Sequence, residues 1–252
     1  MPMVLAGLFG LLIGSFLNVC IYRLPRDLSI VWPASRCTTC GRELSWYENI
    51  PVISYLALRA RCRSCGERIS PMYPLIEIVT ALIFAGALAW YGLTPLFAVR
   101  LVFACAMVVL SVIDLQHQIL PNEITLPGIA VGLVASVFLE PGFRDALIGA
   151  VAGAAILWLI AWTYERLRHQ EGLGFGDVKM LAMIGAFLGW PSMLLTLVIA
   201  SFLGSVVGLS LIASNRGDLG SKLPFGTFLA AAAIVSALAG PDIIAWYAGF
   251  YR

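Results

Sequence analysis

Four cysteines in one polar stretch of the chain have the spacing of a metal site. They form two C-x-x-C pairs, Cys37 with Cys40 and Cys62 with Cys65, and a glycine follows each pair directly. Two such tight turns can place four thiolates tetrahedrally around Zn²⁺. The 21 residues between the pairs slightly exceed the separation of about 15–20 residues that is usual for this pattern. The sequence therefore predicts a structural zinc site, because four cysteine ligands leave no open position for a substrate.

Two other uses of these cysteines stay open at the level of sequence, namely two disulfide bonds or a redox-active pair. A polar loop on the cytoplasmic side of a membrane lies in a reducing environment, which argues against disulfides. Cys20 and Cys105 lie within apolar segments, where a free cysteine packs as a small apolar side chain. We therefore expect these two cysteines to be packing residues.

Two aspartates stand at the ends of long apolar segments, where ionisable side chains are costly and usually functional. Asp114 ends one such segment, and Asp177 begins another, just after Gly174 and Gly176. Two carboxyl groups held close together cannot both ionise at low cost, so such a pair shares a proton. The ionised group can deprotonate a water while the protonated group polarises a carbonyl, which is the chemistry of aspartic proteolysis. We predict that Asp114 and Asp177 are a catalytic pair, with the two glycines permitting close backbone approach.

The rest of the chain is apolar enough to form membrane helices that position these groups. It is 60% hydrophobic and 12% charged, against about 25% charged for a typical soluble domain. Unbroken apolar runs also exclude the alternating pattern of a transmembrane β-barrel. Eight segments come near the roughly 20 residues that span a hydrocarbon core, the sixth and seventh being joined at Pro191: 3–22, 75–91, 96–113, 124–139, 146–164, 178–190, 193–213 and 227–247. We predict an all-α polytopic membrane protein of about eight transmembrane helices, with a small zinc-ribbon-like insertion between the first two.

The pattern divides the chain into three parts. Residues 1–22 form the first transmembrane helix, 23–74 the cytoplasmic four-cysteine zinc module, and 75–252 a membrane core of seven helices. No Lys or Arg precedes the first apolar segment, whereas Arg23 and Arg26 follow it. A cleaved signal peptide would show the opposite order, so we expect a retained helix.

The distribution of positive charge predicts the orientation of these helices. With the N-terminus outside and eight spans, the inside segments are 23–74, 114–123, 165–177 and 214–226. Only Arg100, Arg144 and Arg252 of the 16 Lys and Arg residues fall on the outer side, because Lys179 lies at the inner end of its span. By the positive-inside rule, both termini are outside, and the cysteine module and both aspartates are cytoplasmic. The net charge of +2 is thus a sign of topology and gives no indication of nucleic-acid binding.

Several motifs along the chain resemble those of the type IV prepilin peptidases. The similar segments cover nearly the whole sequence: 14–25, the cysteine segment 35–66, 73–77, 114–122, 174–179 and 222–226. The glycine-flanked aspartate alone is shared with presenilin-like proteases, but its combination with the four cysteines and the N-terminal motif is more specific. Two positions depart from the common pattern, Asn122 where many members have Asp and Thr227 where many have Pro.

The resemblance implies a substrate and a second activity that no residue pattern reveals. Members of this family are bifunctional enzymes of the bacterial inner membrane that serve type IV pilus and type II secretion systems. They cut the basic leader from prepilins and pseudopilins after a Gly, at the cytoplasmic face. They then methylate the new N-terminal residue, usually Phe, with S-adenosylmethionine as the methyl donor.

The resemblance also implies roles for individual residues. It assigns catalysis to Asp114 and Asp177, and supporting positions around them to Gly174, Gly176, Lys179 and Gly226. Candidates for methyl transfer or substrate binding are Asn18, Arg23 and Glu77, because they lie in family motifs near the cysteine module. No Rossmann-type fingerprint is present, so a methyl-donor site would have to be built in another way. The alternative role of these three residues is helix termination and snorkelling at the membrane interface.

Three other functions are compatible with parts of the pattern. One is a leader peptidase without methyltransferase activity, and another is a presenilin-like protease that cuts within a membrane helix. The third is a transporter or assembly scaffold whose two aspartates carry protons. The sequence shows no inverted repeat of the kind that many transporters have, which argues against the third.

Overall fold

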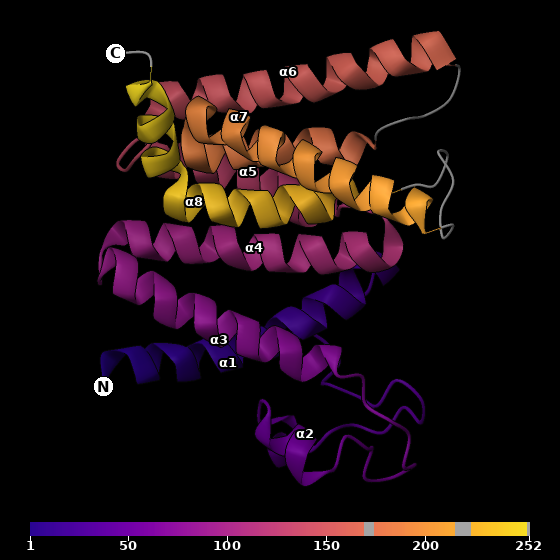
Figure 1. Ribbon diagram of the computed structural model, residues 1–252. Helices are drawn as coiled ribbons and strands as arrows, with labels where there is room; N and C mark the ends of the chain where they lie inside the picture. The colour runs from indigo at the N-terminus through magenta and orange to yellow at the C-terminus, as the bar shows by residue number, and fades with distance from the viewer. Residues whose placement is uncertain (169–173, 215–222, 251–252) are drawn as a thin grey trace. The chain divides into compact units, whose positions relative to one another are not determined.

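The computed structural model describes residues 1–168, 174–214 and 223–250 (Figure 1). Within these ranges the chain is helical, and its only β-pairings are two isolated bridges. The chain divides into two compact units, unit 1 (Met1–Val109) and unit 2 (Leu110–Arg252). Lys222, which the motif comparison placed in the last cytoplasmic loop, lies outside the described residues. The predicted all-helical fold class is confirmed.

Unit 1 is built on the packing of α1 (Pro2–Arg23) against α3 (Met72–Tyr91). Two glycines of α1 let the helices approach closely. A Cβ at Gly10 would lie 2.7 Å from the Cα of Ala81, and one at Gly14 would lie 2.7 Å from the Cα of Glu77. Small residues four apart on one face permit this kind of contact between membrane helices. The sequence of α1 thus fixes the backbone of α3 at the position of Glu77.

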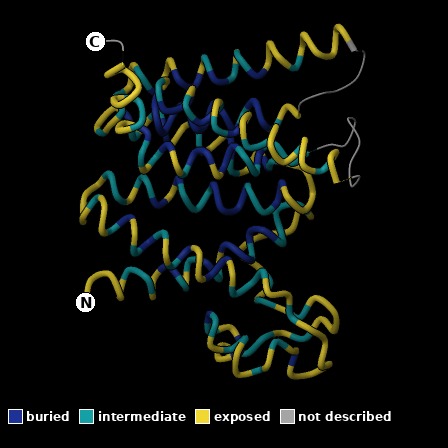
Figure 2. Tube along the Cα trace, viewed as in Figure 1, coloured by how far each residue is buried: buried dark blue, intermediate teal, exposed yellow. Residues whose placement is uncertain are grey.

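Residues 24–71, the part of the cysteine module that lies outside α1 and α3, connect the end of α1 to the start of α3 (Figure 1). The regular structure of this part is limited to three short helices: η1 (Leu24–Arg26), η2 (Trp46–Asn49) and α2 (Ile53–Ala57). The other end of α3 packs through an apolar cluster, Phe84, Ala87 and Leu101, the last of which belongs to α4 (Pro95–His117). The apolar contacts of unit 1 are therefore strongest among its helices, and the module has few buried side chains (Figure 2).

Unit 2 consists of the last turns of α4 together with α5 (Asn122–Ser136), α6 (Phe143–Arg168), α7 (Phe175–Ala213) and α8 (Phe225–Gly249). The first part of α7 is its core, since every residue from Asp177 to Gly189 is buried except Lys179. A helix that is apolar all round lies in a protein core or within a membrane, and the burial of this part of α7 is explained by α5, α6 and α8, which all contact α7. Gly185 of α7 packs so closely on α6 that a Cβ there would lie 2.2 Å from the backbone of Gly149.

The sixth and seventh predicted spans form the two halves of α7. The backbone leaves the helical conformation at Gly189, with φ 77° and ψ 168°, and Figure 1 shows the chain reversing direction within α7. The break therefore lies two residues before Pro191, the position predicted from the sequence. A positive φ is open to glycine, whereas proline is tolerated in the first turn of the helix that follows.

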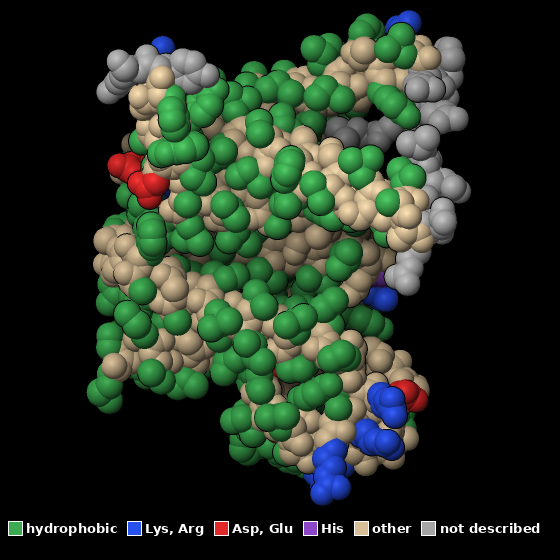
Figure 3. Space-filling view, in the orientation of Figure 1, with side chains coloured by type: hydrophobic (Ala, Val, Ile, Leu, Met, Phe, Trp, Pro, Cys, Tyr) green, Lys and Arg blue, Asp and Glu red, His purple; other side chains and the backbone are tan. Residues whose placement is uncertain are grey.

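Six helices of the described chain are long and apolar enough to cross a membrane: α1, α3, α4, α6, α7 and α8. The remaining predicted span is α5, whose 15 residues fall short of the usual length. Apolar side chains cover the helices on the face in Figure 3, and Lys and Arg side chains gather on the cysteine module. The eight predicted segments are thus all helical, and the chain has the surface of a polytopic membrane protein.

Candidate active site

The two aspartates lie at helix ends within unit 2. Asp114 is in the last turn of α4, and Asp177 is the third residue of α7. Both side chains are buried, with exposed fractions of 5% and 8%. Their charges are close enough to interact. The fold therefore brings together two carboxyl groups that are 63 residues apart in the sequence.

Asp114 is oriented by the start of α8. The backbone N–H of Thr227 donates to Asp114 Oδ2 at 2.7 Å. The Thr227 hydroxyl lies 3.2 Å from the same oxygen and 3.0 Å from the carbonyl oxygen of Ser111, one turn earlier in α4. A Cβ at Gly226 would lie 3.1 Å from the carboxyl carbon of Asp114. The carboxyl group is thus held from one side by an N–H group and a hydroxyl, with room that a glycine provides.

Asp177 has a different environment. Its backbone N–H donates to the carbonyl oxygen of Gly174 at 3.1 Å, and its position in the first turn of α7 places the carboxyl group at the positive end of a helix dipole. Its Oδ1 is buried and has no hydrogen-bond partner among the described residues. A buried carboxylate oxygen without a donor costs free energy, which a proton shared with a second carboxyl group removes.

Leu120 fills the space between the two glycine motifs. A Cβ at Gly176 would lie 2.9 Å from the Cβ of Leu120, and one at Gly226 would lie 3.1 Å from its Cδ1. Both glycines therefore permit close packing of the chain segments that carry and support the aspartates. In the sequence, Leu120 has no feature that indicates a role, and Thr227 stands out only as a departure from the family pattern. No signal in one sequence shows that a leucine will pack against two distant glycines.

Lys179 lies on the exposed side of the same helix end. Its ammonium group donates to the side-chain carbonyl of Asn122 at the start of α5, and it lies 5.6 Å from the centre of the Phe175 ring. It therefore links the starts of α5 and α7 beside the aspartates and forms no ion pair with either of them within the described residues.

The four predicted metal ligands come together in unit 1. The sulfurs of Cys37, Cys40, Cys62 and Cys65 all lie within 4.8 Å of one another, and those of Cys37 and Cys65 are 3.9 Å apart. Four sulfurs at about 2.3 Å from a tetrahedral Zn²⁺ would be separated by about 3.8 Å. The arrangement therefore fits Zn²⁺ in both ligand type and spacing.

The two cysteine pairs are held by matching turns. Gly41 donates its N–H to the Cys37 carbonyl, and Gly66 donates to the Cys62 carbonyl, both at 2.9 Å. These glycines have φ of 71° and 73°, a conformation that side chains disfavour. Backbone N–H groups of the following residues lower the pKa of Cys37, and those of Cys65 and Ser64 lower the pKa of Cys62 to about 6. At Cys65 the Glu67 N–H acts in the same direction, but desolvation and hydrogen bonds with the other three thiols raise the pKa to about 11. The turns therefore favour the thiolate form at the first cysteine of each pair.

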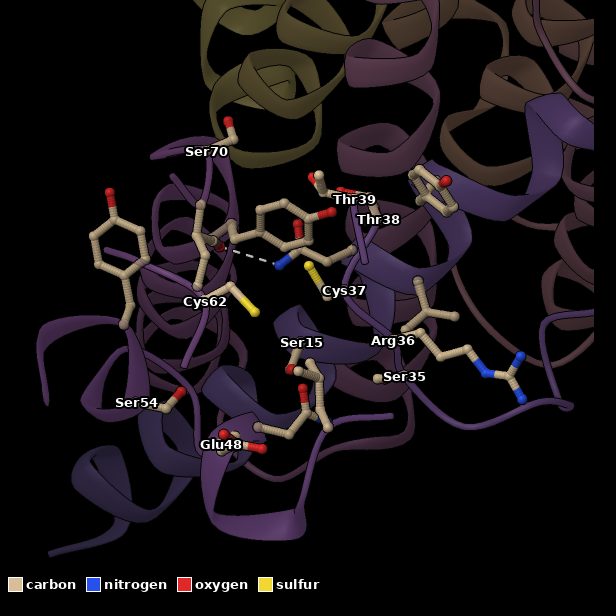
Figure 4. A pocket seen from close by; sticks show the side chains of 18 of the residues that line it. Ser15, Ser35, Arg36, Cys37, Thr38, Thr39, Glu48, Ser54, Cys62 and Ser70 are labelled. Atoms are coloured by element: carbon tan, nitrogen blue, oxygen red, sulfur yellow. Dashed lines mark hydrogen bonds between the residues drawn. The ribbon is translucent and has the colours of Figure 1, made fainter. Parts of the chain in front are cut away.

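A cavity of about 660 Å³ lies between the cysteine module and the ends of α1 and α3 (Figure 4). Asn18, Arg23 and Glu77 all line it. The Asn18 side chain donates to the carbonyl oxygen of Tyr73 at 3.1 Å, which joins α1 to the start of α3. The Arg23 guanidinium donates to the carbonyl oxygens of Ser29, Pro33 and Ala34 and so fixes the first loop of the module.

Two protein-family models match the chain, and the boundary between them lies close to the boundary between unit 1 and unit 2. Residues 8–91 match the bacterial peptidase A24 N-terminal domain, and residues 101–209 match the type IV leader peptidase family. The chain is 40% identical to a prepilin leader peptidase/N-methyltransferase of Pseudomonas putida over 96% of its own length and 92% of the relative. A relative from Pseudomonas aeruginosa with the same description is 37% identical over 96% of the chain and 92% of the relative. Another, from Myxococcus xanthus, is 47% identical over 82% of the chain and 62% of the relative.

No solved structure matches the chain. The family models cover both the unit that holds the cysteine cluster and the segments that carry the two aspartates. Relatives with more than 30% identity extend over nearly all of the sequence. The chain is therefore a member of the type IV leader peptidase family.

Proposed function

We propose that this protein is a membrane aspartic endopeptidase that removes the leader from type IV prepilins and pseudopilins after a Gly and then N-methylates the new N-terminal residue. The buried pair of Asp114 and Asp177 at adjoining helix ends carries the peptidase part of this proposal. The similarity to proteins described as prepilin leader peptidase/N-methyltransferases supports both activities.

The surroundings of the two aspartates suggest how they divide the work. Asp114 receives an N–H donor from Thr227, and such a donor stabilises a carboxylate. Asp177 has a buried oxygen without a donor and is the natural carrier of the shared proton. In this scheme Asp114 deprotonates the attacking water while Asp177 donates a hydrogen bond to the scissile carbonyl, which lowers the barrier to the tetrahedral intermediate.

Around this pair, Gly174, Gly176 and Gly226 act by leaving room for close packing, and Lys179 acts by joining the starts of α5 and α7. The bond to be hydrolysed lies in the prepilin backbone, next to the apolar helix of the prepilin, which would be embedded in the membrane. A catalytic pair at helix ends suits such a substrate, because the cleavage site is then at the same depth as the two aspartates.

The location of the protein follows from its charges and its family. We propose the bacterial inner membrane, with both termini outside and with the cysteine module and the aspartates on the cytoplasmic side, as the positive-inside rule predicts. In this arrangement residues 1–22, 23–74 and 75–252 are the first membrane helix, the zinc module and the peptidase core. The substrates are the prepilins or pseudopilins of a type IV pilus or type II secretion system.

The four cysteines would hold Zn²⁺ as a structural ion. Bound zinc would supply cross-links between two turns that have few apolar contacts of their own. Methylation requires S-adenosylmethionine as the methyl donor, and Asn18, Arg23 and Glu77 are the proposed residues for it. A peptidase that lacks this second activity is the alternative.

Mass spectrometry of a prepilin incubated with the purified full-length protein and S-adenosylmethionine tests the proposal. We expect wild type to remove the leader and add one methyl group. Asp114→Asn and Asp177→Asn should each reduce cleavage by about 10³-fold or more, because the shared proton is lost. Asp242→Asn, which changes an exposed acid of α8, is the control and should cleave normally. Cleavage that survives either of the first two changes would refute the assigned pair.

A further inference from the structure

We infer that the cavity of unit 1 binds S-adenosylmethionine and that Glu77 accepts the proton of the amine to be methylated. This inference rests on the proposed methyltransferase activity and gives it a site. All of the residues that line the cavity belong to unit 1, whereas the two aspartates belong to unit 2.

The cavity has the size and lining of a small-molecule site. Its volume of about 660 Å³ lies within the range of roughly 300–1,000 Å³ that such sites occupy. One wall is formed by α1 and α3 and the other by the cysteine module, including Cys37 and Cys62, which are both labelled in Figure 4. If a bound metal orders the cysteine module, that metal also determines the shape of the cavity.

The lining suits a ligand that carries both a cation and an anion, because it combines aromatic rings with four arginines, among them Arg23, which can meet a carboxylate such as that of S-adenosylmethionine. Four large aromatic side chains contribute to the walls: Tyr22, Trp32, Tyr55 and Tyr73. The ring faces of Trp and Tyr attract cations, and quaternary ammonium groups are bound by such rings in other proteins. The sulfonium of S-adenosylmethionine is a cation of this kind, and its adenine ring offers a flat face for stacking.

Glu77 differs from the other acids that line the cavity. Glu48 is paired with Arg42, whose guanidinium lies 2.5 and 2.7 Å from its two oxygens, and Glu67 is exposed. Glu77 is 7% exposed and forms no ion pair with any Lys or Arg of the described residues. A buried carboxyl group without a cation of its own is available to a positively charged ligand or to a proton.

The position of Glu77 is fixed by a strained turn. The backbone N–H of Val52 donates to Glu77 Oε2 at 2.8 Å, and the hydroxyl of Ser15 on α1 also interacts with the carboxyl group. Val52 has φ 60° and ψ −47°, a conformation that is very rare for a β-branched residue and is found mainly at functional sites. The module therefore uses a strained residue to orient the one unpaired buried acid of the cavity.

The proposed reaction balances in charge and atoms. The ammonium group of the new N-terminus gives one proton to the Glu77 carboxylate and becomes a neutral amine. Its lone pair forms a bond to the methyl carbon of the donor, while the bond between that carbon and sulfur breaks and leaves its electron pair on sulfur. The products are the methylated ammonium and S-adenosylhomocysteine, and Glu77 then releases its proton to solvent.

Ligand binding tests the site without any need for turnover. Calorimetry with S-adenosylmethionine, in the absence of a prepilin, and the full-length protein in nanodiscs should show binding that Tyr55→Ala weakens by about tenfold. Tyr47→Ala, which removes an aromatic ring of the module outside the cavity lining, is the matched control and should bind as wild type. Irradiation of wild type with labelled S-adenosylmethionine should attach the label within residues 15–77, and labelling confined to unit 2 would overturn the inference.

The role of Glu77 is tested by comparing two activities in one mass spectrum. Glu77→Gln should reduce methylation by about 100-fold or more and leave leader cleavage within about twofold, whereas Glu43→Gln, an exposed acid outside the lining, should change neither. The loss should shrink near about pH 9, where an N-terminal amine is already neutral, which a structural defect would not produce. If Glu77→Gln reduces methylation equally at neutral pH and near about pH 9, the role of Glu77 is refuted. Failure of wild type to bind the donor while it still cleaves would refute the site and leave the peptidase intact.

Discussion

The two units of this protein each bury acidic side chains beside a close contact between helices, but they complete their sites by different means. In unit 2, both aspartates lie on helices, and the helices around them pack directly on the first half of α7. In unit 1, Glu77 lies on a helix, but the opposite wall of its cavity is the cysteine module, which has little regular structure. The site of unit 2 therefore depends on helix packing, and that of unit 1 depends on a module that hydrogen bonds hold and that a metal bound by its four cysteines would cross-link.

This difference has a consequence for the two activities. Changes that disturb helix packing in unit 2 should remove cleavage, and changes that loosen the cysteine module should affect methylation first. Because cleavage must precede methylation of a natural prepilin, methylation is best measured on a peptide that already has a free N-terminal Phe.

The largest effect is expected where α6 and α7 touch. Gly185→Ala would place a Cβ 2.2 Å from the backbone of Gly149, and backbone atoms cannot move aside as a flexible side chain can. We expect a loss of about 3 kcal/mol or more in the free energy of unfolding, with loss of leader cleavage. Gly204→Ala in the same helix is the control, since its nearest contact would be an ordinary 3.5 Å. Thermal unfolding in detergent measures both, and equal stability of the two variants would contradict the role of this packing.

Removal of the metal should separate the two sites. We expect about one zinc per chain by mass spectrometry of metals, as four cysteine ligands predict. Chelation, or Cys62→Ser, should reduce methylation of the free peptide at least tenfold more than leader cleavage, because Cys62 lines the unit 1 cavity and not the aspartate pair. Cys105→Ser, outside the cluster, should retain the metal. An equal loss of both activities would show that the units are not independent.

A smaller effect is expected at Thr227. Thr227→Val removes the hydroxyl that lies 3.2 Å from Asp114 Oδ2 but keeps the backbone N–H at 2.7 Å. A single hydrogen bond of this kind contributes about 0.5–1.5 kcal/mol, so cleavage should fall by roughly 2–10-fold. Thr227→Ser keeps the hydroxyl and should cleave at nearly the wild-type rate. A valine variant as active as wild type would show that the N–H alone orients the aspartate.

The smallest effect concerns the stability of the module at low pH. The Ser45 N–H and the Arg42 side chain lower the pKa of Glu48. A lowered pKa in the folded state stabilises the fold above the usual pKa of the group, and this contribution is lost as the pH falls through the folded value. Glu48→Gln should therefore lower the unfolding temperature at pH 7, and the difference from wild type should shrink below about pH 4. Glu43→Gln, whose ion pair with Arg36 is exposed, should show little difference at either pH.

Much of this architecture could be predicted from the sequence because it rests on local patterns. Apolar runs of nearly membrane-spanning length gave all eight helical segments, and the C-x-x-C-Gly spacing gave the four-cysteine cluster with its two positive-φ glycines. The interruption of the helix between the sixth and seventh segments was predicted at Pro191 and lies at Gly189. Either residue can interrupt a helix, so composition alone could not decide between them.

The side chains that can do chemistry are recognisable from the sequence, because cysteines at metal-ligand spacing and acids at the ends of apolar segments are local patterns. The partners of these side chains could be found only in the folded structure. Thr227 reaches Asp114 across 113 residues of sequence, and Val52 reaches Glu77 across 25. Such contacts depend on how closely helices approach, which glycines at positions such as 14 and 185 allow. The physical reason is that close packing is a property of two surfaces together, and each surface is specified by a different part of the chain.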